Sequence, residues 1–331
     1  MAGKKFRESI GLNDEIVYHY CSVEAMYGIF SSKSFWLTFL ESSNDTSELK
    51  LAAKSIKEAI SELKNDYPNG EYDEIFNKIE IAPKDNSYNK YKPRYRYYGV
   101  SLVKEKDSLT HWERYANNAG GVCIGMNIAI IKELLDSYGI IEIFFNWLEA
   151  NPIIYSNEEQ IKFAKSSIKA EIKRLSEELK DLKKVDFFCS FIYYRTLSAL
   201  KPLYKHQGFE SEKEHRICLI EGEAEANSKR MKDLINKSST SNKEPFKNMS
   251  KNIYDLAAEL KVLKKNIKHQ VFKDGIRSYY ALNLENIWSD ELIPEVVLGP
   301  KCYQNKKELQ NFLKSCELIK TKISVSKIPL R

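Results

Sequence analysis

Several features that define common protein classes are missing from this 331-residue chain. No apolar stretch reaches about 18 residues, which argues against a membrane-spanning helix. The start, Met1 to Arg7, is basic but lacks the apolar core of a secretory signal peptide. We therefore expect a cytoplasmic protein that does not act at a membrane.

Cysteine is sparse and scattered. The six cysteines form no C-x-x-C pair, and none lies at metal-ligand spacing from a histidine. Four of them sit in apolar or aromatic surroundings, which is typical of small core residues in a reduced protein: Cys123, Cys189, Cys218 and Cys316. We expect no metal site. A Gly-x-Gly-x-x-Gly loop and a P-loop are also absent, so nothing supports a Rossmann fold or a nucleoside triphosphatase.

What is present is enough apolar material for a core and a localised positive charge. Hydrophobic residues make up 43% of the chain, and its formal net charge is +6. Residues 225–270 carry eleven Lys/Arg against five Asp/Glu, so this segment alone accounts for a charge of +6. The pattern indicates one basic face, with a solvated surface and a nucleic-acid contact as the two interpretations.

Hydrophobic periodicity predicts mixed strands and helices without βαβα alternation. We expect strands near residues 15–20, 34–38, 95–102, 122–126, 140–145, 152–155, 278–284, 294–298 and 322–328, and one starting at the Glu212 motif. Helices are expected near 23–30, 47–66, 108–117, 128–137, 158–184, 253–267 and 306–315. Because no linker separates two cores, we expect one α+β domain over 1–331. Its insertions are helical at about 156–200 and basic and partly flexible at about 223–270.

The motif Glu212-x-Glu214-x-Arg216 precedes an apolar run and is the first candidate for chemistry. Because side chains alternate along a strand, Glu212 and Glu214 are expected on one face, at the mouth of a buried strand. Two carboxylates so placed suit catalysis, since the environment of one of them can shift its pKa. The alternative is a charged strand end with a Glu–Arg ion pair.

Several short motifs follow one another in a specific order along the chain. They are Tyr18-His19-Tyr20, Phe35-Trp36-Leu37, Ser42 to Glu48, Val100-Ser101-Leu102, Trp112-x-x-Tyr115-Ala116, Gly120 to Gly125, Lys205, Phe209, the Glu212 motif and Val297 to Pro300. This order resembles the bacterial domain-of-unknown-function family DUF2971, similar to abortive-infection proteins of the AbiGi type. The resemblance spans about residues 16–300, against which the segments 156–190 and 225–270 look expanded.

The resemblance implies an ADP-ribosyltransferase-like fold, with a mainly antiparallel central sheet and NAD as substrate. Enzymes of that fold place a His or Arg on the first strand, a Ser, Thr or Tyr on a middle strand and a Glu on a late strand. The matching residues here are His19, Ser101 and Glu214. Glu212 takes the earlier place in the Glu-x-Glu turn, which orients the acceptor.

Aromatic and basic residues complete the expected NAD site. Tyr20 or Tyr115 would stack on nicotinamide, and Arg216 belongs to the binding set. Each has a structural alternative: a satisfied strand histidine for His19, a core role for Tyr115, and an ion pair with Glu48 or Glu212 for Arg216. On the expected helix at 253–267, a basic face would contact nucleic acid, with Lys261, Lys264, Lys265 and Lys268.

The first functional hypothesis is therefore an NAD-using, ADP-ribosyltransferase-like effector of anti-phage abortive infection, a bacterial toxin that modifies nucleic acid or protein or hydrolyses NAD. The second is a module without catalysis that senses a nucleotide, a phage-derived protein or a cognate defence protein. A nuclease ranks third, because the acidic residues form no metal-binding cluster in the sequence.

Overall fold

The computed structural model describes residues 15–40, 48–67, 69–70, 72–83, 95–137, 146–178, 186–222, 267–272 and 275–330. Its strands are β1 (Ile16–Cys21), β2 (Ser34–Phe39), β3 (Tyr95–Val103), β4 (Val122–Asn127), β5 (Asn146–Pro152), β6 (Glu214–Gly222), β7 (Ile267–Phe272), β8 (Gly275–Asn283), β9 (Glu295–Leu298) and β10 (Lys322–Val325). Its helices are α2 (Val23–Ser32), α3 (Glu48–Asp66), α4 (Asp73–Ile81), α6 (Leu109–Tyr115), α7 (Ile128–Ser137), α8 (Asn157–Glu178), α9 (Asp186–Leu200) and α12 (Lys306–Ser315), with short 3₁₀ helices η3 (Lys201–Leu203), η4 (Gln207–Glu212) and η5 (Glu285–Ile287).

The described strands form one ten-stranded sheet in the order β10-β9-β4-β1-β3-β2-β8-β7, and β6 and β5 branch from β3. Every named pairing is antiparallel except that of β10 with β9. The expected α+β class with a mainly antiparallel sheet is confirmed. The sheet divides at β3, which pairs with β6 along its whole length and on its other side with both β2 and β1.

Local signals account for the first elements. The Ser22 Oγ accepts a hydrogen bond from the Ala25 amide at 3.1 Å and begins α2. Lys33, at φ 46°, ends that helix in the left-handed conformation and starts the turn into β2. Both the helix and the strand that follows were predicted from the sequence.

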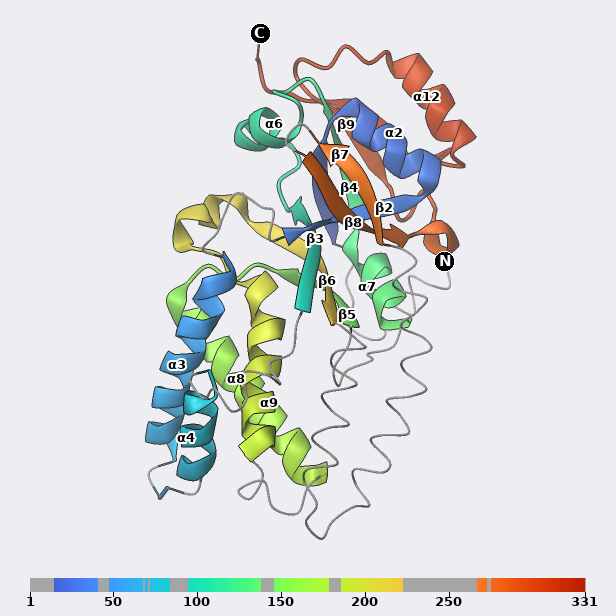
Figure 1. The fold of residues 1–331 in the computed structure, drawn as a ribbon. Coiled ribbons are helices and arrows are strands. Elements are labelled where there is room, and N and C mark those ends of the chain that lie inside the picture. Colours follow the sequence, from blue (N-terminus) through green and yellow to red (C-terminus); the bar gives the residue numbers. More distant parts are fainter. Residues whose placement is uncertain are drawn as a thin grey trace.

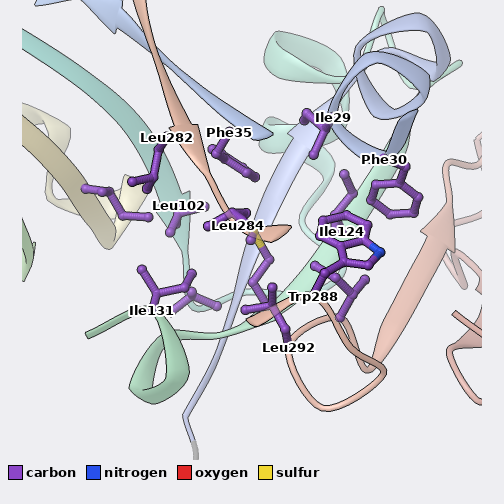
Figure 2. Close-up of a cluster of buried hydrophobic side chains, with 14 of the residues drawn as sticks. Ile29, Phe30, Phe35, Leu102, Ile124, Ile131, Leu282, Leu284, Trp288 and Leu292 are labelled. Carbon is purple, nitrogen blue, oxygen red and sulfur yellow. The ribbon is translucent and has the colours of Figure 1, made fainter. Parts of the chain in front are cut away.

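The main core lies between one face of the sheet and the helices that cover it. Figure 2 shows this core, where Phe30 of α2, Phe35 of β2 and Leu102 of β3 converge with Ile131 of α7. All four side chains are buried. Burial of so many large apolar groups is the dominant favourable contribution to folding.

The helices α3, α4, α8 and α9 gather at one end of the molecule and bury a second core (Figure 1). The predicted stripe of α3 lies in this core, with Ile56 and Ile60 almost fully buried. We call these four helices the helical bundle. The segment 201–212, which joins the bundle to β6, lies between the bundle and α6 (Figure 1).

Two sequence predictions need correction, and two others lie outside the described residues. Glu212 ends η4, and β6 begins only at Glu214, because Lys213 adopts a left-handed conformation at φ 44° and interrupts the extended backbone. The strand expected at 152–155 was wrong, because β5 ends at Pro152 and Ile154 beyond it forms an isolated bridge with Tyr204. The strand expected at 140–145 and the flexible stretch 223–250 lie outside the described residues.

Candidate functional site

Glu212 and Glu214 meet at one point although only one of them is in a strand. Glu212 is the last residue of η4, and Glu214 is the first of β6. The left-handed Lys213 between them turns the backbone, so that both carboxylates reach the ammonium of Lys205. The side chains of Glu212 and Glu214 are buried, at 7% and 2% exposed.

Lys205 bridges the two carboxylates. Its Nζ lies 2.6 Å from Glu212 Oε2 and 3.1 Å from Glu214 Oε2, and Lys205 itself is 8% exposed. The same ammonium lies 5.0 Å from the ring centroid of Phe209, a cation–π contact from η4. Buried charges are tolerated when they are paired and hydrogen-bonded, as these are.

The second carboxylate oxygen of Glu214 is held by β3 and β6. Its Oε1 accepts the Ser101 hydroxyl at 2.5 Å and Arg216 Nε at 2.7 Å. The register explains the convergence, because Ser101 pairs with Arg216 and Val103 with Glu214 across the two strands. Ser101 is exposed, so this hydroxyl joins the buried carboxylate to the solvent-facing side of the cluster.

The backbone of Glu214 is fixed as well. Its amide donates to the Tyr155 hydroxyl at 2.9 Å, and its carbonyl accepts from the Ile153 amide at 2.9 Å. Arg216 Nη1 donates to the Pro202 carbonyl at 3.0 Å. Each residue around Glu214 is thus tied to a different segment of the chain, which restricts the motion of its carboxylate.

Two opposing effects set the charge of Glu214. Burial raises the pKa of this carboxyl, whereas the positive charges of Arg216 and Lys205 and the hydrogen bonds from Arg216 and Ser101 lower it, with a net result of about 2. Glu214 is therefore ionised at neutral pH. Two carboxylates and two cations make the buried group of Lys205, Glu212, Glu214 and Arg216 electrically balanced; we call it the charge cluster.

Helix α6 forms the partly exposed wall beside the charge cluster. The Tyr115 hydroxyl donates to Glu212 Oε1 at 3.2 Å, and Arg114 Nη1 lies 3.6 Å from the same oxygen. Burial and the nearby Glu212 charge raise the pKa of Tyr115. The Tyr115 side chain is 46% exposed, so its ring can meet a ligand while its hydroxyl touches the cluster.

A buried histidine backs this wall. His111 is 2% exposed, its Nδ1 lies 2.8 Å from Ser108 Oγ, and its ring centroid is 5.9 Å from that of Tyr115 and 5.3 Å from that of Tyr20. Burial lowers the pKa of His111, which favours the neutral ring. His111 thus lies on the buried side of α6 and packs this helix against Tyr20 of β1.

Tyr20 lies deeper than the expected nicotinamide platform. It is 6% exposed, its hydroxyl donates to the Glu105 carbonyl at 2.8 Å, and it accepts from the Ser108 amide at 3.0 Å. These bonds anchor the chain just before α6, in a small core that also contains Trp112. Of the two tyrosines considered from the sequence, Tyr115 is the one that contacts the charge cluster.

His19 lies on the other face of the sheet. Tyr18 pairs with Val103, so by alternation Tyr20 and Ser101 share a face whereas His19 points to the opposite one. There its ring packs edge-on against Phe35, with centroids 4.9 Å apart, and its Nδ1 lies 3.2 Å from the Ser101 carbonyl oxygen. Desolvation lowers the pKa of His19 to about 4. The structure therefore brings together the side chains of Ser101 and Glu214 but not that of His19.

The basic face predicted on a helix is described only at its last residue. Lys261, Lys264 and Lys265 lie outside the described residues. Lys268 is exposed in β7, opposite Tyr279 of β8, because residues 267–272 pair with β8 in a hairpin. Its placement on the same helix face as the other three lysines was wrong.

The described residues include neither a group that could hold a metal ion nor a helix that could span a membrane. No group of three or more His, Cys, Asp or Glu side chains among them is arranged to hold a metal ion. None of the helices in the described part of the chain has the length and apolar character needed to span a bilayer.

The sequence motifs do not reveal three residues of the site. They include Lys205 but give no reason to place its ammonium between Glu212 and Glu214, and they do not include Tyr155 or Arg114. One signal for Lys205 is its position seven and nine residues before Glu212 and Glu214, because a buried ammonium needs carboxylates as partners.

The family model described as "Protein of unknown function (DUF2971)" matches residues 111–217 and thus supports a relation to that family over less than half of the chain. The matched part includes Tyr115, Lys205, Glu212, Glu214 and Arg216, but not His19 or Ser101. No curated protein and no solved structure matches the chain.

Proposed function

We propose that the chain is an NAD-using enzyme of the ADP-ribosyltransferase type, with the charge cluster and the adjacent α6 wall as its active site. The observation that supports this most is the junction of Glu212 with Tyr115. A buried, hydrogen-bonded carboxylate there touches the hydroxyl of a half-exposed aromatic ring. The proposal includes a sheet of the ADP-ribosyltransferase-like type, because the sheet divides at β3 next to this site.

Cleavage of the nicotinamide–ribose bond gives each residue a role. As the bond breaks, its electron pair goes to the nicotinamide nitrogen, nicotinamide leaves neutral, and positive charge builds on the ribose as an oxocarbenium-like ion. A carboxylate beside that ion stabilises it and accepts a hydrogen bond from a ribose hydroxyl. Water or an acceptor nucleophile then captures the ribose carbon.

Glu212 is the better placed of the two carboxylates for contact with substrate. Its Oε1 faces Tyr115 and Arg114 on the partly exposed side, whereas its Oε2 is held by Lys205. Glu214 is surrounded by Ser101, Lys205 and Arg216, so we assign it chiefly the positioning of Lys205. The two glutamates thus act together, with Glu212 toward the ribose and Glu214 behind it.

The α6 wall supplies the groups that would bind the rest of NAD. The Tyr115 ring offers a face for nicotinamide, whose ring is cationic in NAD. The guanidinium of Arg114, which is 58% exposed, is suited to a pyrophosphate because arginine recognises phosphate through paired N–H groups. Ser101 adds an exposed hydroxyl at the edge of the cluster.

One observation favours a second candidate, a nucleotide-binding or phage-protein-sensing module without catalysis. Both oxygens of Glu214 already have partners in the chain, and the cluster carries no excess negative charge to stabilise a cation. Such an arrangement suits recognition of a ligand as well as its cleavage. Turnover, as opposed to binding alone, separates the two candidates.

The proposed biological setting is anti-phage abortive infection, which rests on the family resemblance. The acceptor would be nucleic acid or protein, and NAD hydrolysis is the outcome when water is the acceptor. Exposed Lys268, with Lys261, Lys264 and Lys265, would contact a nucleic-acid acceptor or trigger.

The test is to incubate the full chain with NAD, alone and with single-stranded RNA, double-stranded DNA or a cell lysate, and to measure free nicotinamide by chromatography. Release above a boiled-protein control supports the enzyme. NAD binding in calorimetry without nicotinamide release under any of these conditions supports the sensing module. If NAD is neither bound nor cleaved, the enzyme and an NAD-sensing module are both contradicted.

A further inference from the structure

Lys205 is presented to the charge cluster by a short two-stranded segment outside the main sheet. Residues 153–155 and 203–205 run parallel, joined by a bridge between Ile154 and Tyr204. The Ile154 amide donates to the Leu203 carbonyl at 2.9 Å, and the Lys205 amide donates to the Ile154 carbonyl at 3.3 Å. The same segment carries Tyr155, whose hydroxyl accepts the amide of Glu214. Two contacts of the site thus depend on this segment.

One buried side chain of the helical bundle closes the segment. Gln160, in the first turn of α8, is 3% exposed. Its Nε2 donates to the Ile154 carbonyl at 2.8 Å and to the Lys205 carbonyl at 3.0 Å. The backbone carbonyl of Gln160 accepts the Tyr204 hydroxyl at 2.6 Å, so this residue contacts both sides of the pair.

We propose that Gln160 is a positioning residue for the candidate site: its side-chain amide fixes the backbone of Lys205, so that the ammonium reaches Glu212 and Glu214 together. An apolar side chain at this position would remove the hydrogen bonds that Gln160 donates to the carbonyl groups of Ile154 and Lys205, and the loss of a buried hydrogen bond costs more than the loss of an exposed one. The strand pair would then relax. The Lys205 ammonium would leave the position that gives 2.6 Å and 3.1 Å to the two carboxylates.

This role connects the helical bundle to the site. Ala164 and Ile168 continue the buried face of α8 below Gln160 and pack in the bundle core with Tyr204. A displacement of α8 would therefore reach Lys205 through one amide. The effect on catalysis rests on the proposed function, whereas the effect on Lys205 itself does not.

The test compares Gln160→Met with Ser55→Ala. Methionine keeps the length and helix propensity of glutamine but removes both donors. Ser55 is a matched control, because it is 1% exposed, lies in α3 of the same bundle and donates to the Leu51 carbonyl, without a part in the 203–205 segment. Native protein is treated briefly with acetic anhydride, and acetylation of each lysine is measured by mass spectrometry. Lys213, whose side chain is 59% exposed, is the internal reference.

Gln160→Met should raise the acetylation rate of Lys205 relative to Lys213 by about tenfold, which corresponds to the loss of roughly one buried hydrogen bond. Ser55→Ala should leave that ratio unchanged, even at an equal fall in melting temperature. If the wild type releases nicotinamide, Gln160→Met should lower kcat by about tenfold with little change in KM. The positioning role would be overturned if the acetylation rate of Lys205 relative to Lys213 were the same in Gln160→Met and Ser55→Ala, whether raised in both or unchanged in both. A wild type that releases no nicotinamide would contradict the proposed enzyme, and the Lys205 ratio would still decide the role of Gln160.

Discussion

Replacing Lys205 by methionine should reveal how far the site depends on one buried ammonium. The change keeps most of the apolar stem but removes the charge that lies 2.6 Å from Glu212 and 3.1 Å from Glu214. Both carboxylates stay buried, and Glu214 keeps its bonds to Arg216 and Ser101. One negative charge in the cluster is then left without its balance.

The cost can be estimated from the burial of the pair. Removing one partner of a buried ion pair typically destabilises a protein by about 3–5 kcal/mol, because the other charge is left uncompensated. For a chain of this size such a loss lowers the melting temperature by roughly 5–10 °C. Lys213→Met is the matched control, because Lys213 is an exposed lysine next to the same motif and pairs with Glu105. It should melt close to the wild type.

The pH dependence of the stability is an independent test of the same ion pair. In the wild type the pKa of Glu214 is lowered to about 2, so its contribution to stability is complete above its ordinary value of 4.5 and is lost as the pH falls toward 2. In Lys205→Met one of the two charges that lower the pKa of Glu214 is gone, so this pKa moves back toward its ordinary value while Arg216 still lowers it. Glu214 then contributes less stability above pH 4.5, and the difference from the wild type disappears as the pH falls from 4.5 toward 2.

The assay is thermal unfolding at pH 7 and pH 3 of the wild type, Lys205→Met, Glu212→Gln and the double variant. The melting deficit of Lys205→Met should shrink at pH 3, which lies inside the window in which Glu214 loses its contribution. The double variant should recover part of the deficit, because a single carboxylate remains beside Arg216. A Lys205→Met protein that melts within about 1 °C of the wild type at pH 7 would refute the ion-pair reasoning.

Three further predictions concern the other sequence candidates. Tyr115→Ala should raise KM for NAD by roughly tenfold, whereas Tyr115→Phe should leave it nearly unchanged if the ring rather than the hydroxyl binds nicotinamide; equal KM values in both variants would exclude stacking. His19→Ala should lower the melting temperature and leave NAD affinity unchanged, as measured by calorimetry, because its ring packs on Phe35 away from the cluster; weaker NAD binding at an unchanged melting temperature would restore its predicted role. Changing Lys261, Lys264, Lys265 and Lys268 to glutamate should weaken nucleic-acid binding and flatten its dependence on salt, by roughly three to four units of the log–log slope; binding equal to the wild type at low and moderate salt would leave the segment as a solvated surface.

Elements with strong local signals could be predicted from the sequence. The helix α3 has apolar residues at three- and four-residue spacing that are buried in the structure, and Ser22 caps α2 as expected. The start of β6 was placed two residues early, because nothing local in the sequence indicates that Lys213 takes a left-handed conformation. The placement of Lys268 on a helix failed because hairpin pairing with β8 outweighed the spacing of its lysines.

The candidate site was only partly predictable, for reasons of geometry. Glu212, Glu214 and Arg216 lie together in the sequence, so their association follows from a local motif. The face on which His19 points depends on the register of β1 against β3, which a one-residue shift would reverse. The contacts of Tyr155 and Gln160 with this region depend on a strand pair formed with residues 203–205, and no local pattern reveals such a pairing.

Nicotinamide release from NAD by matched variants bears most directly on the proposed function. The wild type should release nicotinamide. Glu212→Gln should lower kcat/KM by about 10²–10³, because the isosteric amide removes the charge that would stabilise the developing cation. Glu214→Gln should lower kcat/KM as well, because Lys205 loses one of the two carboxylates that hold it. Lys213→Met should retain full activity, and circular dichroism should show that all variants are folded. An active site at the charge cluster would be contradicted if both glutamine variants turned over NAD as fast as the wild type. It would also be contradicted if the wild type showed no turnover either with or without nucleic acid.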